Sequence, residues 1–194
     1  ENYSLQRQHA LSLVRSIWVL FVDADERVPP ALADEAIAAV RSGRADGFWI
    51  PRRNVFWGHS MQGGGWWPDH QLRLLRVACA QYDPARAVHE VASVDGTTEC
   101  LVTPMIHLNY DSLAEFRSKQ RHYSELEARR RAADGLEPSL HGLILQPLRE
   151  FRRRYVGLCG WRDGGTGLAV CGLMAWYELR TMLTTSRIRG RIRP

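Results

Sequence analysis

Lysine is nearly missing from this sequence. Lys119 is the single lysine among 26 lysine and arginine residues, and the formal net charge at pH 7 is +5. A guanidinium matches the geometry of phosphate oxygens, so an arginine excess is typical of proteins that bind phosphate, anionic lipid or nucleic acid. A bias in genomic base composition explains the same excess equally well. The charge is therefore compatible with anionic partners but does not choose among them.

Long apolar runs and paired cysteines are also absent. No stretch reaches the ~18 consecutive apolar residues of a membrane-spanning helix. The cysteines form no C-x-x-C pair and no zinc-binding spacing; they are Cys79, Cys100, Cys159 and Cys171. These absences argue against a spanning protein and a zinc site. We expect reduced, buried thiols in a cytosolic protein.

The most informative stretch joins an apolar run to an acidic cluster. Residues 17–22 are all apolar and lead directly into Asp23, Asp25 and Glu26. Such a run predicts a strand buried on both faces, as in a parallel sheet, with Asp23 and Asp25 on the same side at its carboxyl end. Two carboxylates there suit Mg or Mn carrying a phosphorylated ligand. An ordinary acidic turn is the alternative.

The remaining pattern predicts an α/β region followed by a helical, basic region. Residues 1–110 are expected to hold the sheet, and residues 111–194 the helical extension, whose arginine runs suit an anionic membrane surface. The expected strands are residues 17–22, 47–56, 71–77, 87–91 and 100–108, and the expected helices are 3–15, 31–42, 113–133, 139–156 and 168–183. Pro51 is expected at a sheet edge or bend. Glycine-rich loops are expected at residues 58–65 and 159–167.

Several side chains outside the acidic cluster are candidates for binding or catalysis. Trp66 and Trp67 follow three glycines, which suits either a mobile lid over a sugar or a surface loop pinned by two buried rings. Asp69 is a candidate catalytic carboxylate or a turn residue. Arg73 suits a diphosphate or is one of two paired surface arginines. A further pair, His89 and Glu90, is either a phosphate or metal contact with a general base, or a core histidine beside a surface glutamate.

Taken in order, these segments resemble the family 2 glycosyltransferases of the GT-A fold, a Rossmann-like fold of nucleotide-diphospho-sugar transferases. The similarity is greatest to the bacterial group that builds the lipopolysaccharide inner core, the β-glucosyltransferase type. It covers nearly the whole chain. The matching segments are residues 6–7, the DXD turn 23–26, and residues 64–69, 72–76, 88–90, 107–110, 151–155 and 160–164 with Gly167.

This resemblance implies an inverting, metal-dependent transfer of sugar from a nucleotide-sugar donor to a glycan or lipid-linked acceptor. By analogy, Asp25 binds Mg or Mn on the diphosphate, and Asp23 approaches the ribose or the metal shell. Glu90 is the base that deprotonates the acceptor, with Asp69 as the second choice. The protein is then expected in the cytoplasm, peripheral at the inner face of the cytoplasmic membrane, where cell-envelope glycans are built.

One departure from the family pattern affects the expected activity. Family members begin with two strands that hold the nucleotide, and the sequence opens instead in the helix before the DXD strand. We therefore expect a GT-A sheet incomplete at its N-terminus, with an exposed apolar edge, and a segment that can be inactive by itself.

Two other functions account for parts of the pattern. A haloacid-dehalogenase-type phosphatase also has an apolar strand with D-x-D, but Arg27 and the isolated Lys119 fit its motifs poorly. A non-enzymatic basic membrane-binding module would explain the arginine runs. Nucleic acid is not an expected partner, because these runs lack the interleaved aromatic residues that stack bases.

Overall fold

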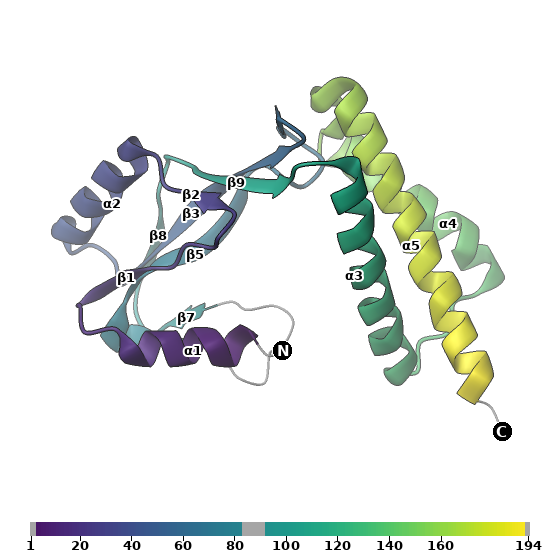
Figure 1. The fold of residues 1–194 in the computed structure, drawn as a ribbon, viewed down its shortest axis with the longest axis horizontal. Coiled ribbons are helices and arrows are strands. Elements are labelled where there is room, and N and C mark those ends of the chain that lie inside the picture. Colours follow the sequence, from purple (N-terminus) through teal and green to yellow (C-terminus); the bar gives the residue numbers. More distant parts are fainter. Residues whose placement is uncertain (1–2, 83–91, 193–194) are drawn as a thin grey trace. The chain divides into compact units, whose positions relative to one another are not determined.

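The computed structural model describes residues 3–82 and 92–192 (Figure 1). The described chain divides into two units. The sheet unit comprises residues 1–54 and 68–108, and the helical unit comprises residues 55–67 and 109–194. Residues 55–67 thus lie in the helical unit although they come between two segments of the sheet unit. The expected strand at 87–91 lies outside the described residues.

The sheet unit contains one mixed sheet and a small antiparallel pair. The strands of the sheet are β1 (Trp18–Leu20), β2 (Glu26–Arg27), β3 (Gly47–Phe56), β5 (Asp69–Arg76), β8 (Thr98–Cys100) and β9 (Met105–Tyr110). Their order is β1-β5-β3-β9-β2, and β8 pairs in parallel with the first residues of β3. A 3₁₀ turn (Val77–Cys79) leads from β5 into β6 (Ala80–Tyr82), which pairs with β7 (Ala92–Val94).

Helices cover both faces of this sheet (Figure 1). α2 (Pro30–Ser42) buries Leu32 against Phe48 of β3 in one core. α1 (Tyr3–Leu13) buries Leu11 against Leu72 and Leu75 of β5 in a second core. Neighbouring strand residues enter different cores because side chains alternate across a strand. The unit is thus mixed α/β, as predicted, and its architecture is compatible with a Rossmann-like fold.

β1 corrects the prediction for the apolar run. It pairs antiparallel with β5 and ends the strand order among the described strands. Its residues are half-buried, and the flanking Ile17 and Val22 are exposed. The expectation of a parallel strand buried on both faces is therefore wrong. An apolar run alone does not reveal how many neighbours a strand has.

Two other strand predictions need correction. Pro51 lies within β3, which has neighbours on both sides, so it is not at a sheet edge. A shift of register between Phe48 and Trp49 precedes it, which places an irregularity close to the proline. The predicted strand at residues 100–108 is two strands, β8 and β9, with Pro104 between them. Two strand predictions are confirmed, since β3 has the bounds expected at residues 47–56 and β5 overlaps the strand expected at residues 71–77.

The helical unit has three long helices, α3 (Leu113–Ala133), α4 (Leu140–Arg152) and α5 (Gly164–Ile192) (Figure 1). α3 begins where the sequence predicts, because Ser112 caps it by accepting the Glu115 N–H at 3.1 Å. The Glu115 carboxylate in turn accepts the Asp111 N–H at 2.8 Å. α4 continues into a π-helical turn (Arg153–Gly157), and a 3₁₀ turn (Gly160–Asp163) precedes α5.

Aromatic rings form the core of this unit at the end where α3 begins. Phe56 and Phe116 are fully buried, and Tyr110 lies 4.8 Å from each of them between ring centroids. Tyr177 of α5 extends the cluster from Phe116. The hairpin of β3 with β4 (His59–Ser60) carries Phe56 into this core. Edge-to-face packing of this kind explains why residues 55–67 belong to the helical unit.

The predicted flexible loop at residues 58–65 is instead packed tightly. A Cβ on Gly63 would lie 2.2 Å from the Cys159 carbonyl oxygen, and the Gly64 N–H donates to the Leu158 carbonyl at 2.7 Å. The predicted loop at 159–167 is also wrong, because Gly164 begins α5. Glycine here permits close contact between backbones, which outweighs its low helix propensity.

Gly167 gives a direct test of this packing. A Cβ there would lie 1.9 Å from the Gly160 carbonyl oxygen, a backbone atom that cannot move aside. We expect Gly167→Ala to lower the free energy of unfolding by about 3 kcal/mol, the upper range for overpacking. Gly172→Ala in the same helix meets no atom within 4 Å. It should stabilise by about 0.5–1 kcal/mol. Urea denaturation followed by circular dichroism measures both, and equal effects would contradict this account.

The structure also tests the expectations about membrane spans and thiols. Within residues 3–82 and 92–192, no helix combines the length and apolar character needed to cross a membrane. All four cysteines are free thiols, but only Cys171 is buried, and Cys100 is exposed. Burial raises the pKa of the Cys171 thiol. The expectation of buried thiols is therefore correct for one cysteine and wrong for Cys100.

Candidate active site

The acidic stretch after β1 forms a turn, with each carboxylate held differently. The Glu26 N–H donates to the Asp23 carbonyl at 3.0 Å, and the Asp23 N–H donates to the Glu26 carboxylate at 2.8 Å. Asp23 and Asp25 lie in this turn and not in a strand. The strand geometry that predicted a shared orientation for the two side chains is therefore absent, and their partners differ.

Two arginines hold Asp23 at the edge of the sheet unit. Arg7 of α1 donates to one carboxylate oxygen at 2.7 Å, and Arg73 of β5 donates to the other at 2.5 Å. Burial raises the pKa of the Asp23 carboxyl, but the charges of Arg73 and Arg7 outweigh burial, so the pKa lies below its ordinary value. Asp23 is ionised and charge-compensated.

Glu26 is the buried centre of this network. Its side chain is 0% exposed, and Arg73 and Arg52 approach the same oxygen at 3.0 and 3.4 Å. Arg73 reaches it from β5. There the arginine occupies a buried position between Leu72 and Leu74, in an otherwise apolar part of the strand. A buried carboxylate requires such partners, because a low-dielectric surrounding penalises an isolated charge.

Asp69 belongs to the same network through Arg52. Arg52 donates twice to one Asp69 oxygen, at 2.9 and 2.6 Å, and the Asn54 amide donates to that oxygen at 3.1 Å. Gln71 donates to the other oxygen at 2.8 Å. Burial raises the pKa of Asp69, but Arg52 and these donors outweigh it and hold the pKa below its ordinary value. A carboxylate so stabilised is a weak base.

His107 of β9 connects Asp69 with Asp25. Asp69 can only accept, so the Asn54 amide nitrogen faces it and the Asn54 oxygen faces His107 Nδ1, 2.6 Å away. Nδ1 therefore carries the hydrogen. Burial and the charge of Arg52 together lower the pKa of His107 despite its two acidic neighbours, Asp25 and Glu26, which favours neutral imidazole. The lone pair of Nε2 then lies 3.3 Å from an Asp25 oxygen.

This pair of acceptors is suited to a cation. A neutral imidazole nitrogen and a carboxylate oxygen repel each other unless a proton or a metal ion lies between them. Asp25 is also the one carboxylate of the turn that no arginine contacts in the described chain, and it is 45% exposed. Within residues 3–82 and 92–192, no three His, Cys, Asp or Glu side chains cluster as metal ligands. The chain thus offers two ligands, and a diphosphate or water would supply the others.

Comparison with known proteins bears on the class of reaction. No protein-family model matches the chain. The chain is similar to a glycosyltransferase. It is 29% identical over 199 residues to the lipopolysaccharide core biosynthesis glycosyltransferase LpsC of Rhizobium meliloti (strain 1021), an alignment that covers 98% of this chain and 70% of LpsC. This similarity supports a transferase role.

The other predicted site residues do not all lie together. Arg73 lies in the network described above, together with Asp23 and Asp69. Trp66 lies in the helical unit, with Arg154 stacked on its ring at 4.7 Å and Phe56 against it at 5.3 Å. Trp67 belongs to the same unit and is half-buried. His89 and Glu90 lie outside the described residues, so the proposed base stays a prediction.

Several residues of the network were not singled out in the sequence as site candidates. Among them are Arg7, Arg52 and Asn54. Arg52 and Asn54 are two residues apart in β3, so they share a face, and Arg52 pairs with Asp69 in the strand register. Their polar character beyond Pro51, in a strand that begins with apolar residues, was the available signal. The pairing with β5 that completes the site is set by tertiary structure.

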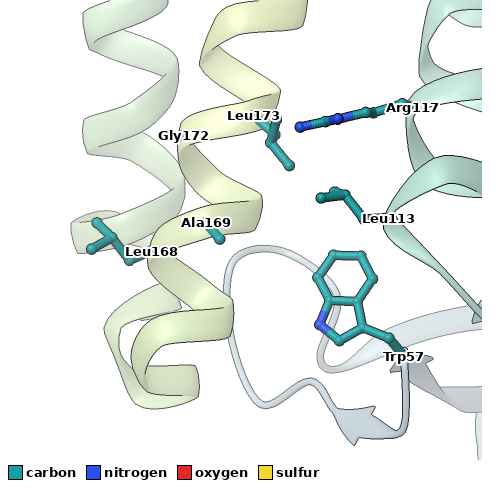
Figure 2. A pocket seen from close by; sticks show the side chains of 7 residues that line it. All are labelled: Trp57, Leu113, Arg117, Leu168, Ala169, Gly172 and Leu173. Carbon is teal, nitrogen blue, oxygen red and sulfur yellow. The ribbon is translucent and has the colours of Figure 1, made fainter.

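A pocket in the helical unit differs in chemistry from the charged network of the sheet unit. It has a volume of about 740 Å³ and is lined by Trp57, Leu113, Arg117, Leu168, Ala169, Gly172 and Leu173. Figure 2 shows Arg117 extending from α3 across the pocket toward Leu173 of α5. The lining is almost wholly apolar, so this pocket does not suit the charged diphosphate of a nucleotide sugar.

Proposed function

We propose that this chain is part of a metal-dependent, inverting glycosyltransferase of family 2 with the GT-A fold. It moves a sugar from a nucleotide-diphosphate sugar to a glycan or lipid-linked acceptor of the lipopolysaccharide core, in the cytoplasm at the inner face of the membrane. The similarity to LpsC supports the reaction class. The observation that carries the site is the contact of His107 Nε2 with the Asp25 carboxylate, 3.3 Å apart, in which neither group is bound by an arginine of the described chain.

In this proposal Asp25 and His107 hold Mg or Mn. When bound, that cation neutralises the charge that develops on the departing diphosphate. Asn54 holds His107 in the tautomer that presents Nε2, by accepting the Nδ1 hydrogen at 2.6 Å. Arg73 and Arg7 already compensate Asp23, so they are better suited to holding the acidic turn than to gripping the donor.

Asp69 and Glu90 are the two candidates for the base that deprotonates the acceptor hydroxyl. Asp69 has a lowered pKa and three side-chain donors, which favours a role in positioning Arg52 and Asn54 over proton abstraction. Glu90 stays the predicted base, and it would take the hydroxyl proton as the oxygen attacks the anomeric carbon from the side opposite the diphosphate. Trp66 and Trp67 stay predicted sugar contacts.

The rival functions receive less support from these contacts. A phosphatase of the haloacid-dehalogenase type needs an aspartate nucleophile after β1 and a lysine near it. Asp23 is bound by two guanidiniums, and Lys119 pairs with Glu115 at 2.8 Å within α3. A non-enzymatic membrane module would leave the buried network of the sheet unit without a use.

Calorimetry of the 194-residue chain with MnCl₂ and a panel of nucleotide sugars tests the proposal. We expect Asp25→Asn to weaken Mn²⁺ binding at least about tenfold, since loss of a supporting group alone already has that effect. Asp34→Asn, which changes an exposed carboxylate of α2, is the matched control and should bind as the unaltered chain does. Unchanged Mn²⁺ affinity in Asp25→Asn would refute the metal assignment. Absence of binding for every nucleotide sugar would refute the function.

A further inference from the structure

α4 displays a stripe of large aliphatic side chains. Leu140, Ile144 and Leu148 are 81%, 73% and 64% exposed, and Leu145 beside them is 48% exposed. The first three are spaced four residues apart, so they share one face of the helix. Surface apolar residues usually occur singly, and a continuous stripe marks a surface that contacts something else.

The stripe faces away from the helices of its own unit. Gly142 is one of the residues of α4 that lie against α5, because a Cβ there would be 3.3 Å from the Met182 methyl group. Gly142 follows Leu140 by two residues and precedes Ile144 by two, which places it on the opposite side of the helix. No residue of α4 is buried. The internal packing of the unit therefore leaves the aliphatic stripe exposed to solvent.

Two arginines border the stripe with their charges uncompensated. Arg149 and Arg152 are exposed and form no ion pair within the described residues. Their neighbours Arg153 and Arg154 both bind Glu150, at 2.8 and 2.5 Å, so those two charges are already used. The same helix thus offers free guanidiniums next to aliphatic side chains, a combination that matches lipid phosphates above acyl chains.

The segment after α4 continues the same character. Val156 and Trp161 are 58% and 54% exposed, and Arg162 lies 5.7 Å from the Trp161 ring. Tryptophan and arginine are favoured at the level of lipid headgroups, where an apolar ring and a charge both find partners. No described helix can cross a membrane. A helix of this composition would therefore lie in the plane of the interface.

We propose that α4 is a membrane-docking helix that inserts Leu140, Ile144 and Leu148 into the surface of an anionic bilayer. Arg149 and Arg152 bind lipid phosphates at its border. A protein partner is less well matched, because an interface would have to supply carboxylates for both arginines beside an aliphatic patch. Membrane binding itself is independent of sugar transfer. Its use, to bring the sheet unit to a lipid-linked acceptor, rests on the proposed function.

Vesicle co-sedimentation tests this assignment with the whole chain. We expect binding to phosphatidylglycerol-containing vesicles and much weaker binding to pure phosphatidylcholine vesicles. The double variant Ile144→Glu with Leu148→Glu should lose at least tenfold in binding. Arg149→Gln and Arg152→Gln should each lose about fivefold. Ile37→Glu on α2, where the native side chain is 51% exposed, is the matched control and should bind like the unaltered chain.

The outcomes separate this proposal from its rivals. Equal binding to both vesicle types, or unchanged binding of the glutamate variants, would refute the docking role. Light scattering that shows a dimer, dissociated by the same glutamates, would assign the stripe to a second copy of the chain and also refute it. Calorimetry with nucleotide sugars on the same variants should be unchanged. Loss of donor binding in all proteins would refute the proposed function and leave the membrane result standing.

Discussion

Replacing Arg73 by methionine is expected to lower the free energy of unfolding of the sheet unit by about 3–5 kcal/mol. Its guanidinium lies 3.0 Å from the Glu26 carboxylate, whose side chain is 0% exposed, and also binds Asp23. Without it, Glu26 keeps the hydrogen bond from the Asp23 N–H, but its remaining charge partner among the described residues is Arg52 at the longer distance of 3.4 Å. A buried carboxylate with so little compensation is costly because the interior solvates charge poorly. Urea denaturation followed by far-ultraviolet circular dichroism measures the loss.

Two further variants distinguish this cause from a general sensitivity to mutation. Arg44→Ala removes an exposed arginine whose partner Glu99 is 3.6 Å away, and it should change stability by less than about 0.5 kcal/mol. Adding Glu26→Gln to Arg73→Met removes the stranded charge and should recover part of the loss. If Arg73→Met alone were as stable as the Arg44→Ala control, the network would contribute little to stability.

Asp163→Ala is expected to destabilise the helical unit by about 3 kcal/mol. The Asp163 side chain is 0% exposed, and it accepts the backbone N–H groups of Gln62 and Gly63 at 2.7 and 2.9 Å. His59 Nε2 lies 3.0 Å from the same carboxylate. Truncation leaves two backbone donors without their acceptor, and each unsatisfied buried donor costs about 1–3 kcal/mol. Thermal and urea denaturation both report the effect.

The control for Asp163 is a carboxylate of similar charge on the surface. Asp134 is 50% exposed and binds Arg130 at 3.1 Å, so Asp134→Ala should change stability by less than about 0.5 kcal/mol. Asp163→Asn keeps the shape and one acceptor oxygen but turns its NH2 toward the other N–H group, so it should recover only part of the loss. If Asp163→Ala were as stable as the Asp134→Ala control, the contacts of Asp163 with the segment at residues 58–65 would contribute little to the stability of the unit.

Local signals predicted the helices well where the sequence contains a cap. The Ser112 and Glu115 pattern predicted the start of α3, and the structure shows the bonds that produce it. Proline at the first turn and Gly43 in the left-handed conformation bound α2 in the same way. These signals act over three or four residues. They do not depend on what the rest of the chain does.

Predictions failed where distant segments decide the outcome. Gly160 and Gly167 suggested a loop, but their small size serves the contact between two turns of backbone, and α5 begins at Gly164. The apolar run before Asp23 suggested a parallel interior strand, but β1 pairs only with β5 in the described sheet. Neither the contact nor the pairing has a signature within a window of ten residues.

For this protein, the sequence by itself determined the mixed α/β character, the capped helices, the acidic cluster at Asp23, Asp25 and Glu26, and the likeness to sugar transferases. Only the tertiary structure decided which of these carboxylates remains without an arginine. That choice depends on Arg7 of α1 and Arg73 of β5, which reach Asp23 and Glu26, and on the pairing of β3 and β9, which places Arg52 beside Glu26 and His107 beside Asp25. Side-chain charges interact over a few ångströms, so their pairing is settled only when strands far apart in sequence meet.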